Sequence, residues 1–154
     1  MIPLVNRPYA GENDLERVID LLLTDRIVHP HHIEHYPTVW RLRQLLATRL
    51  WEPQRDARIW EDTARRCMGF AFLSRRRRED VGDGLECILH PQAPQTELFA
   101  EMLGWAQTRS RERAGERAET IGLGTAFGEG ESDKIAVLEQ HSFTRVDGYN
   151  LYFA

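Results

Sequence analysis

The stretch "LECILHPQAPQTELFAEMLGWAQ", residues 85–107, contains the clearest change of structure in the sequence. Its first six residues are mostly apolar and predict a strand, Pro91 and Pro94 bound a short loop, and apolar residues at helical spacing follow from Thr96. A loop between a strand and a helix N-terminus is a common binding site for phosphate groups. This loop contains no glycine, so its composition argues against the phosphate site that its position suggests.

The segments on either side complete an α/β pattern. Upstream, hydrophobic periodicity predicts a strand over 2–9, a helix over 11–26, a helix over 38–50, and strands over 57–62 and 67–73. Downstream it predicts a helix over 96–113, a strand over 119–127, a helix over 132–141 and a hairpin over 143–154. An antiparallel meander with one strand-helix-strand crossover predicts an α/β sheet with helices on both faces.

Local signals predict where several of these elements begin and end. Asn13 or Asp14 is available to cap the first helix, and Ser132 to cap the helix over 132–141. We expect Pro53 to close the helix that Thr38 opens. The final hairpin should turn at residues 147–148, an Asp-Gly pair.

Length and composition limit the possible functions. A chain of 154 residues with 42% hydrophobic content predicts one domain over 1–154 with one well-buried core. Its net charge of −4 gives no global reason to bind nucleic acid or an anionic membrane, and the RRRR run at 75–78 is followed at once by acidic residues. With no signal peptide or membrane-length segment, and with Cys67 and Cys87 in apolar strand-like runs, we expect a cytoplasmic protein with reduced thiols.

Three segments carry a resemblance to a known family. "IWEDTARRCMGFAFL" (59–73) has the form of paired strands in which a turn leads to a glycine followed by aromatic or aliphatic residues. "LECILHP" (85–91) ends in a Val-x-Pro-like signature, and "VLEQHSF" (137–143) has the place of a short helix that normally runs Tyr-x-x-x-Gly-Phe. Together they resemble the GNAT superfamily of acyl-CoA N-acyltransferases, either as a divergent member or as one half of a tandem GNAT protein.

The resemblance implies a mixed, mostly antiparallel sheet with a splayed pair of parallel strands, here 85–90 and 120–125. It implies acetyl transfer from acetyl-CoA to a primary amine, with the pantetheine arm along the first of these strands and the pyrophosphate at the next helix N-terminus. The residues that this would assign to acetyl-CoA are Cys87, Leu89, Gln95, Thr96, Glu97, Leu98 and Phe99.

Several residues depart from the GNAT pattern. Pro94, Glu97 and Phe99 occupy the positions of Gln/Arg, Gly and Gly/Ala in the family's phosphate loop, so we expect added bulk from Phe99 and an opposing charge from Glu97. Leu138 replaces a tyrosine that acts as general acid in some members, and Ser142 replaces a glycine. Two hypotheses stay open: an enzyme that binds acyl-CoA mainly through strand backbone, or a non-catalytic scaffold that pairs with a second GNAT domain or with its own copy.

Glu86 and His90 are the catalytic candidates. Strand alternation places both on one face, and a carboxylate or an imidazole near the splay point could remove a proton from an ammonium acceptor. The alternative is an exposed or salt-bridged strand residue.

His31, His32 and His35 form a second group of candidates. The resemblance implies that their segment lines the acceptor pocket, so that they would shape substrate binding. The cluster His29, His31, His32, Glu34 and His35 would also suit zinc, since His31 and His35 lie four apart. Prolines interrupt any helix that would align the ligands, which favours a polar loop. We therefore predict no metal site.

Overall fold

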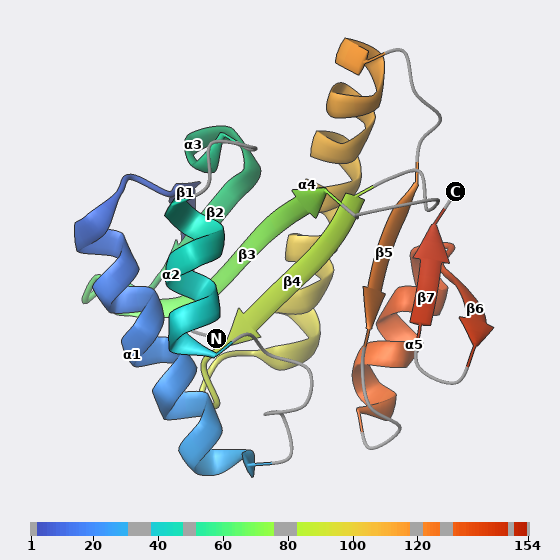
Figure 1. Ribbon diagram of the computed structural model, residues 1–154. Helices are drawn as coiled ribbons and strands as arrows, with labels where there is room; N and C mark the ends of the chain where they lie inside the picture. The colour runs from blue at the N-terminus through green and yellow to red at the C-terminus, as the bar shows by residue number, and fades with distance from the viewer. Residues whose placement is uncertain are drawn as a thin grey trace.

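The computed structural model describes residues 3–30, 38–47, 52–75, 83–117, 122–126, 131–147 and 150–153. The strands are β1 (Val5–Pro8), β2 (Ala57–Glu61), β3 (Cys67–Arg75), β4 (Asp83–Leu89), β5 (Leu123–Ala126), β6 (Thr144–Asp147) and β7 (Asn150–Phe153). The helices are α1 (Glu12–Val28), α2 (Val39–Ala47), α3 (Pro53–Asp56), α4 (Gln95–Arg117) and α5 (Ser132–Gln140). These strands form one sheet in the order β1-β2-β3-β4-β5-β7-β6 (Figure 1).

The sheet contains one parallel pair among antiparallel neighbours. β4 and β5 run parallel and are joined by α4, whereas the other neighbouring strands pair antiparallel. The parallel pairing covers only Asp83 with Leu123 and Gly84 with Gly124. Beyond these residues the two strands diverge toward their carboxyl ends (Figure 1). The mixed, mostly antiparallel sheet with a splayed parallel pair is therefore confirmed.

Side-chain alternation along β4 divides the core between two helical layers. Leu85, Cys87 and Leu89 belong to an apolar cluster that includes α4 and α5 residues. Ile88 belongs to a second cluster that includes Val18, Ile19 and Leu22 of α1. Helices on both faces of the sheet are confirmed, and Glu86, Ile88 and His90 lie on the α1 face.

A glycine on β3 lets α4 approach the sheet closely. A Cβ atom at Gly69 would lie 2.4 Å from Cε of Met102 and 3.1 Å from a Cδ of Leu98. Met102 and Leu98 are buried in the first half of α4. The small residue therefore fixes the position of the helix end that follows β4.

Two of the predicted helix caps are wrong. α1 is preceded by Gly11 at φ 107°, and Asp14 lies inside the first turn, where its carboxylate accepts the N–H of Ala10 at 2.7 Å. α5 is preceded by Glu131, and Ser132 is its first helical residue. In both helices the side chain expected to cap lies within the helix and not before it.

The prediction for Pro53 is also wrong, because this residue opens α3 instead of closing α2. Proline suits the first helical position, where its missing N–H is not needed. The start of α2 is confirmed, since Oγ1 of Thr38 accepts the N–H of Arg41 at 3.1 Å. β4 and α4 are longer than the strand and helix expected from the sequence, and the final hairpin is confirmed by pairing of Asp147 with Asn150.

Both cysteines are free thiols. Burial raises the pKa of Cys67 to about 12 and raises the pKa of Cys87 as well. Neither sulfur is therefore activated as a nucleophile. Within the described residues, no helix combines the length and the apolar character needed to cross a membrane.

Candidate functional site

The backbone of β4 alternates between its two neighbouring strands. The N–H of His90 donates to the carbonyl of Met68 on the β3 side at 2.9 Å. The carbonyl of Leu85 accepts the hydroxyl of Thr125 on the β5 side at 3.0 Å. Because successive residues of a strand point their backbone groups in opposite directions, those of Cys87 and Leu89 point toward β5.

No described residue pairs with this edge of β4. β5 has already diverged at Cys87 and Leu89, and no hydrogen bond from the described part of the chain joins either backbone to it. An extended strand edge with unpaired N–H and C=O groups can bind another extended chain. The backbone of Cys87 and Leu89 is therefore able to pair with an extended ligand that contains amide groups.

The N-terminus of α4 lies directly after this edge. The first helical hydrogen bond runs from the N–H of Leu98 to the carbonyl of Pro94 at 2.9 Å. The N–H groups of Gln95, Thr96 and Glu97 have no carbonyl within the helix, and no described residue accepts from them. Three such donors at the positive end of the helix dipole can bind an anion.

Gln95 closes the loop before α4 without any glycine. Its Nε2 donates to the carbonyl of His90 at 2.8 Å and to that of Ala93 at 3.1 Å. One side chain thus ties the first helical residue to the end of β4 and to the loop. Gln95 acts here as a structural residue that shapes the site.

Phe99 and Glu97, two of the three departures from the family loop, differ in their effect on anion binding. Phe99 is 0% exposed and belongs to the cluster of α4 and α5 residues that includes Leu138 and Phe143. The expectation that its bulk stands in the phosphate position is wrong, because the ring faces the core. Glu97 is exposed in the first turn of α4, so its negative charge is the feature that opposes an anion there.

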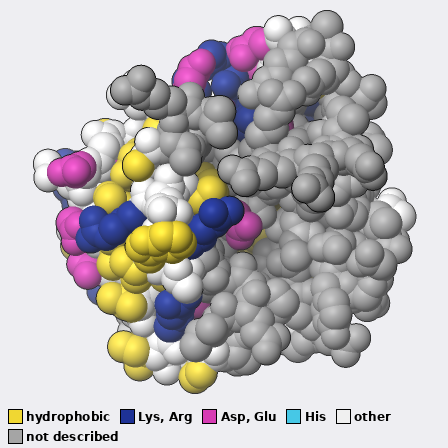
Figure 2. All heavy atoms as spheres, viewed as in Figure 1, with side chains coloured by type: hydrophobic (Ala, Val, Ile, Leu, Met, Phe, Trp, Pro, Cys, Tyr) yellow, Lys and Arg dark blue, Asp and Glu magenta, His cyan; other side chains and the backbone are white. Residues whose placement is uncertain are grey.

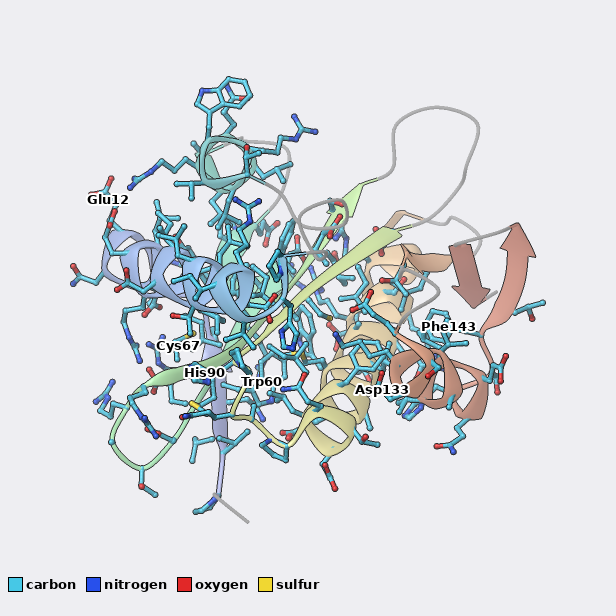
Figure 3. All side chains as sticks on the ribbon, turned by 90° about the horizontal axis from the view of Figure 1, so that it is seen from below. Glu12, Trp60, Cys67, His90, Asp133 and Phe143 are labelled. Atoms are coloured by element: carbon cyan, nitrogen blue, oxygen red, sulfur yellow. The ribbon has the colours of Figure 1, made fainter. Side chains whose placement is uncertain are left out.

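His90 lies where β4 ends, close to α1 (Figure 3). Its Nδ1 accepts the N–H of Gln92 at 3.1 Å, so the neutral ring carries its proton on Nε2. Burial and the positive charge of Arg66 lower the pKa of His90, against opposing effects of Asp25 and Asp62. His90 therefore offers a neutral N–H donor at Nε2. Its lone pair is on Nδ1, so taking up a proton there would break the bond from Gln92.

A carboxylate–imidazole pair that the sequence analysis missed lies at the end of α1. Oδ1 of Asp25 is 3.0 Å from Nδ1 of His29, and Asp25 is 2% exposed. The charge of Asp25 also acts on His90, which places the pair near the end of β4. The carboxylate orients the ring and favours the tautomer with its lone pair on Nε2. The four-residue spacing was the available signal, but the helix predicted over 11–26 ended before His29, whereas α1 continues to Val28.

Of the remaining candidates from the sequence, the structure describes Glu86 only. Glu86 is half-buried on the α1 face of β4. His31, His32 and His35 lie outside the described residues. Among the residues that the structure describes, no group of three or more His, Cys, Asp or Glu side chains could bind a metal ion.

No protein-family model matches the sequence, and no curated protein matches it at a significant level. Solved structures do match. A GCN5-related N-acetyltransferase from Sphaerobacter thermophilus has a TM-score of 0.72 at 13% identity, over 95% of this chain and 45% of its own. An N-acetyltransferase from Staphylococcus aureus has a TM-score of 0.70 at 12% identity, over 98% of both chains.

A third match is yncA from Salmonella typhimurium, solved with its cofactor acetyl-CoA. Its TM-score is 0.68 at 15% identity, over 97% of this chain and 92% of its own. The present chain thus spans less than half of the Sphaerobacter protein and nearly all of the other two. At such low identity these likenesses establish fold. Together with the splayed β4–β5 pair, they show that the chain has the GNAT fold of these acetyltransferases.

Proposed function

We propose that the protein is an N-acetyltransferase that transfers an acetyl group from acetyl-CoA to a primary amine. The observation that carries the proposal is the unpaired β4 edge at Cys87 and Leu89, directly followed by the free N–H groups of α4. The shared fold adds support, because yncA was solved with acetyl-CoA.

The residues present fit most of what acetyl-CoA requires. The backbone of Cys87 and Leu89 would pair with the amides of the pantetheine arm, and the N–H groups of Gln95, Thr96 and Glu97 would bind the pyrophosphate. Leu98 and Phe99 are buried in the core, so in this proposal they hold α4 in place and do not contact the ligand. The carboxylate of Glu97 is the unfavourable element.

Acetyl-CoA would supply an activated thioester: a C–N bond forms to the acceptor, the C–S bond breaks, and CoA leaves as a thiolate that takes up a proton from water. The acceptor nitrogen must lose a proton before it can attack. In the proposal, His29 accepts this proton at Nε2, oriented by Asp25, and Glu86 is the alternative base on the same side of the sheet. His90 stays neutral and donates a hydrogen bond from Nε2. His31, His32 and His35 follow His29 closely in sequence and are proposed to contact the acceptor.

Calorimetry with acetyl-CoA tests the binding site. We expect a dissociation constant on the order of 10 µM, since backbone contacts must offset Glu97. Glu97→Gln should tighten binding roughly threefold or more, because it removes like-charge repulsion at the helix N-terminus. Glu139→Gln, which removes an exposed carboxylate from α5, is the matched control and should leave the affinity unchanged. Absence of binding to both the native protein and Glu97→Gln contradicts the proposal.

Kinetics test the chemistry once an acceptor amine is found. Asp25→Asn should lower kcat by roughly tenfold or more with little change in acetyl-CoA affinity, because the amide no longer orients and polarises His29. His29→Gln should lower kcat by at least as much. Unchanged kcat in both variants would show that His29 is not the base. Glu86→Gln would then test whether Glu86 is.

The alternative is a non-catalytic GNAT-like domain that pairs with a second GNAT domain or with its own copy. Exposed apolar side chains on the helices of one face favour it, among them Ile27 at 82% and Trp40 at 66% exposure. Figure 2 shows hydrophobic side chains gathered on this side of the molecule. Failure to bind acetyl-CoA, combined with a dimer that Ile27→Asp dissociates in sedimentation experiments, would support this alternative.

A further inference from the structure

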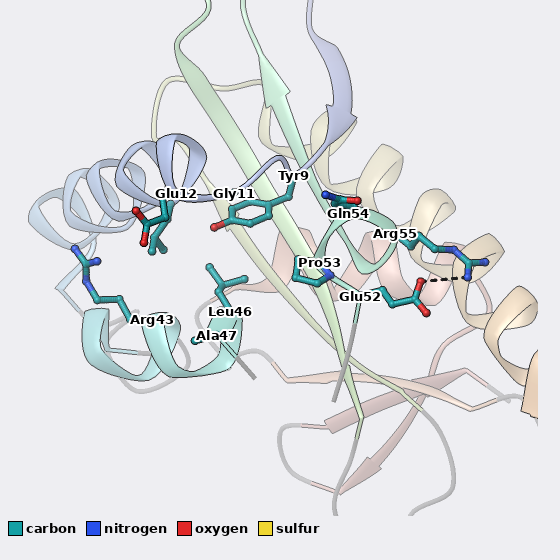
Figure 4. A pocket seen from close by; sticks show the side chains of 11 residues that line it. Tyr9, Gly11, Glu12, Arg43, Leu46, Ala47, Glu52, Pro53, Gln54 and Arg55 are labelled. Atoms are coloured by element: carbon teal, nitrogen blue, oxygen red, sulfur yellow. Dashed lines mark hydrogen bonds and ion pairs between the residues drawn. The ribbon is translucent and has the colours of Figure 1, made fainter. Parts of the chain in front are cut away.

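A cavity of about 550 Å³ lies between the start of α1, the end of α2 and α3 (Figure 4). Its volume is in the range of roughly 300 to 1,000 Å³ that small-molecule sites occupy. Glu12 lines it at the first residue of α1, whereas Asp25 lies more than three turns along the same helix, roughly 20 Å away. The cavity is therefore separate from the candidate acetyltransferase site.

Tyr9 presents an unused hydroxyl to this cavity. The residue is 4% exposed, and its ring packs against Phe70 with 6.0 Å between ring centroids. Figure 4 shows the hydroxyl directed into the space between α1 and α2. No described residue accepts from it or donates to it. A buried phenol usually has a hydrogen-bond partner, so its hydroxyl is available to a ligand.

Among the described residues that line the cavity, one carboxylate has no counter-charge. Arg43 is paired with Glu16 at 2.8 Å, and Arg55 is paired with Glu116 at 2.6 Å and with Glu52 at 3.3 Å. Glu12 makes no hydrogen bond or ion pair with any described residue. Both arginines among the described lining residues are thus already paired, and the charge that remains among these residues is negative.

The charges that act on the Tyr9 hydroxyl are negative. Burial raises the pKa of Tyr9 to about 12, and the negative charges of Asp14 and Glu12 raise it further in the same direction. Burial disfavours a charge of either sign, so only the contribution of Asp14 and Glu12 bears on the ligand, and their negative charge favours a cation. Leu15, Leu46 and Pro53 give the walls an apolar surface next to these polar groups.

We propose that this cavity binds a small organic amine with an apolar body. Its ammonium group donates to the carboxylate of Glu12 and to the hydroxyl oxygen of Tyr9, and its hydrocarbon part lies against Leu15, Leu46 and Pro53. Carboxylate and phenol oxygens accept the hydrogen bonds that an ammonium group donates. The inference does not depend on acetyl transfer.

Hexylamine is a suitable probe, titrated without acetyl-CoA and followed by calorimetry and by two-dimensional NMR. We expect saturable binding with shifts at Tyr9, Glu12 and Leu46, and much weaker binding of 1-hexanol and hexanoate. Glu12→Gln should weaken hexylamine binding roughly fivefold or more, through loss of a charge-assisted hydrogen bond. Tyr9→Phe keeps the ring that packs on Phe70 and should weaken it roughly two- to fivefold.

Asp20→Asn is the matched control, because it removes one exposed carboxylate from α1 without touching the cavity. Its affinity for hexylamine should equal that of the native protein. Equal binding to the Glu12→Gln variant, or tighter binding of hexanoate than of hexylamine, overturns the proposal. Shifts confined to His90 and its neighbours also overturn it, and they leave the proposed acetyltransferase intact.

Discussion

Ser142 has a backbone conformation that glycine adopts more easily. Its φ of 67° lies in the left-handed region, directly after α5. Its N–H donates to the carbonyl of Glu139 and that of Phe143 donates to Leu138, both at 3.1 Å, which is the Schellman pattern of a helix C-terminus. The GNAT pattern has glycine at this position. Here a serine adopts the left-handed conformation that the glycine would favour.

Ser142→Gly should therefore stabilise the protein. Removal of the strained Cβ should add about 0.5–1 kcal/mol to the free energy of unfolding, after the entropy that glycine loses on folding is subtracted. Urea denaturation followed by circular dichroism measures this change. Ser142→Ala keeps a Cβ and should show no such gain, so equal stabilities of the two variants would contradict the explanation.

At the scale of elements, the contact between β3 and α4 is set by Gly69. Gly69→Ala places a Cβ against Met102 and Leu98 in the buried layer and should lower the free energy of unfolding by about 1–3 kcal/mol. Gly104→Ala is the matched control in α4, because nothing lies within 4 Å of its added Cβ. That variant should stabilise the protein by about 0.5–1 kcal/mol. The two melting temperatures must move in opposite directions, and a rise in both would contradict the packing argument.

The second half of α4 shows why sequence patterns predict that a helix forms better than they predict which of its side chains are buried. Arg109 and Arg113 are buried, although arginines in an amphipathic pattern are expected at the surface. Arg109 pairs with Asp56 at 2.7 Å, and Arg113 with Asp83 at 3.3 Å. These partners come from α3 and β4, so only the tertiary arrangement brings the charges together.

For the whole molecule, the sheet with helices on both faces could be predicted because alternation along residues 85–90 is a local signal. Leu85 and Cys87 face α4, and Ile88 faces α1, as period-two spacing requires. The direction of Phe99 and the proximity of Asp25 and His29 to His90 could not be predicted. They depend on how helices rotate and pack against the sheet, and residue spacing within one element does not determine this.

Arg7 adds ion pairs to the backbone pairing that joins β1 to β2. Arg7 on β1 donates to Asp14 of α1 through two bonds of 2.7 Å and to Glu61 of β2 at 2.9 Å. The bonds from Arg7 lower the pKa of Asp14. Burial alone would raise the pKa of Glu61, but the bonds from Arg7 and Arg17 outweigh it and the net shift is downward. Both carboxylates therefore bind protons more weakly in the folded protein than in the unfolded chain.

This difference predicts how stability depends on pH. Carboxylates with lowered pKa values stabilise the folded state above their unfolded pKa values, and the stabilisation is lost as pH falls through the folded ones. The free energy of unfolding should therefore decline below about pH 4.5, where the unfolded chain begins to bind protons. Arg7→Gln should cost about 1–3 kcal/mol at pH 7, and the cost should shrink toward pH 3 as both carboxylates become neutral. Urea denaturation at pH 7, 5, 4 and 3 measures both curves. Arg43→Gln, which removes an exposed ion pair with Glu16, should shift the curve little at any pH. Parallel curves for the native protein and Arg7→Gln would show that Arg7 stabilises the fold without favouring the ionised carboxylates.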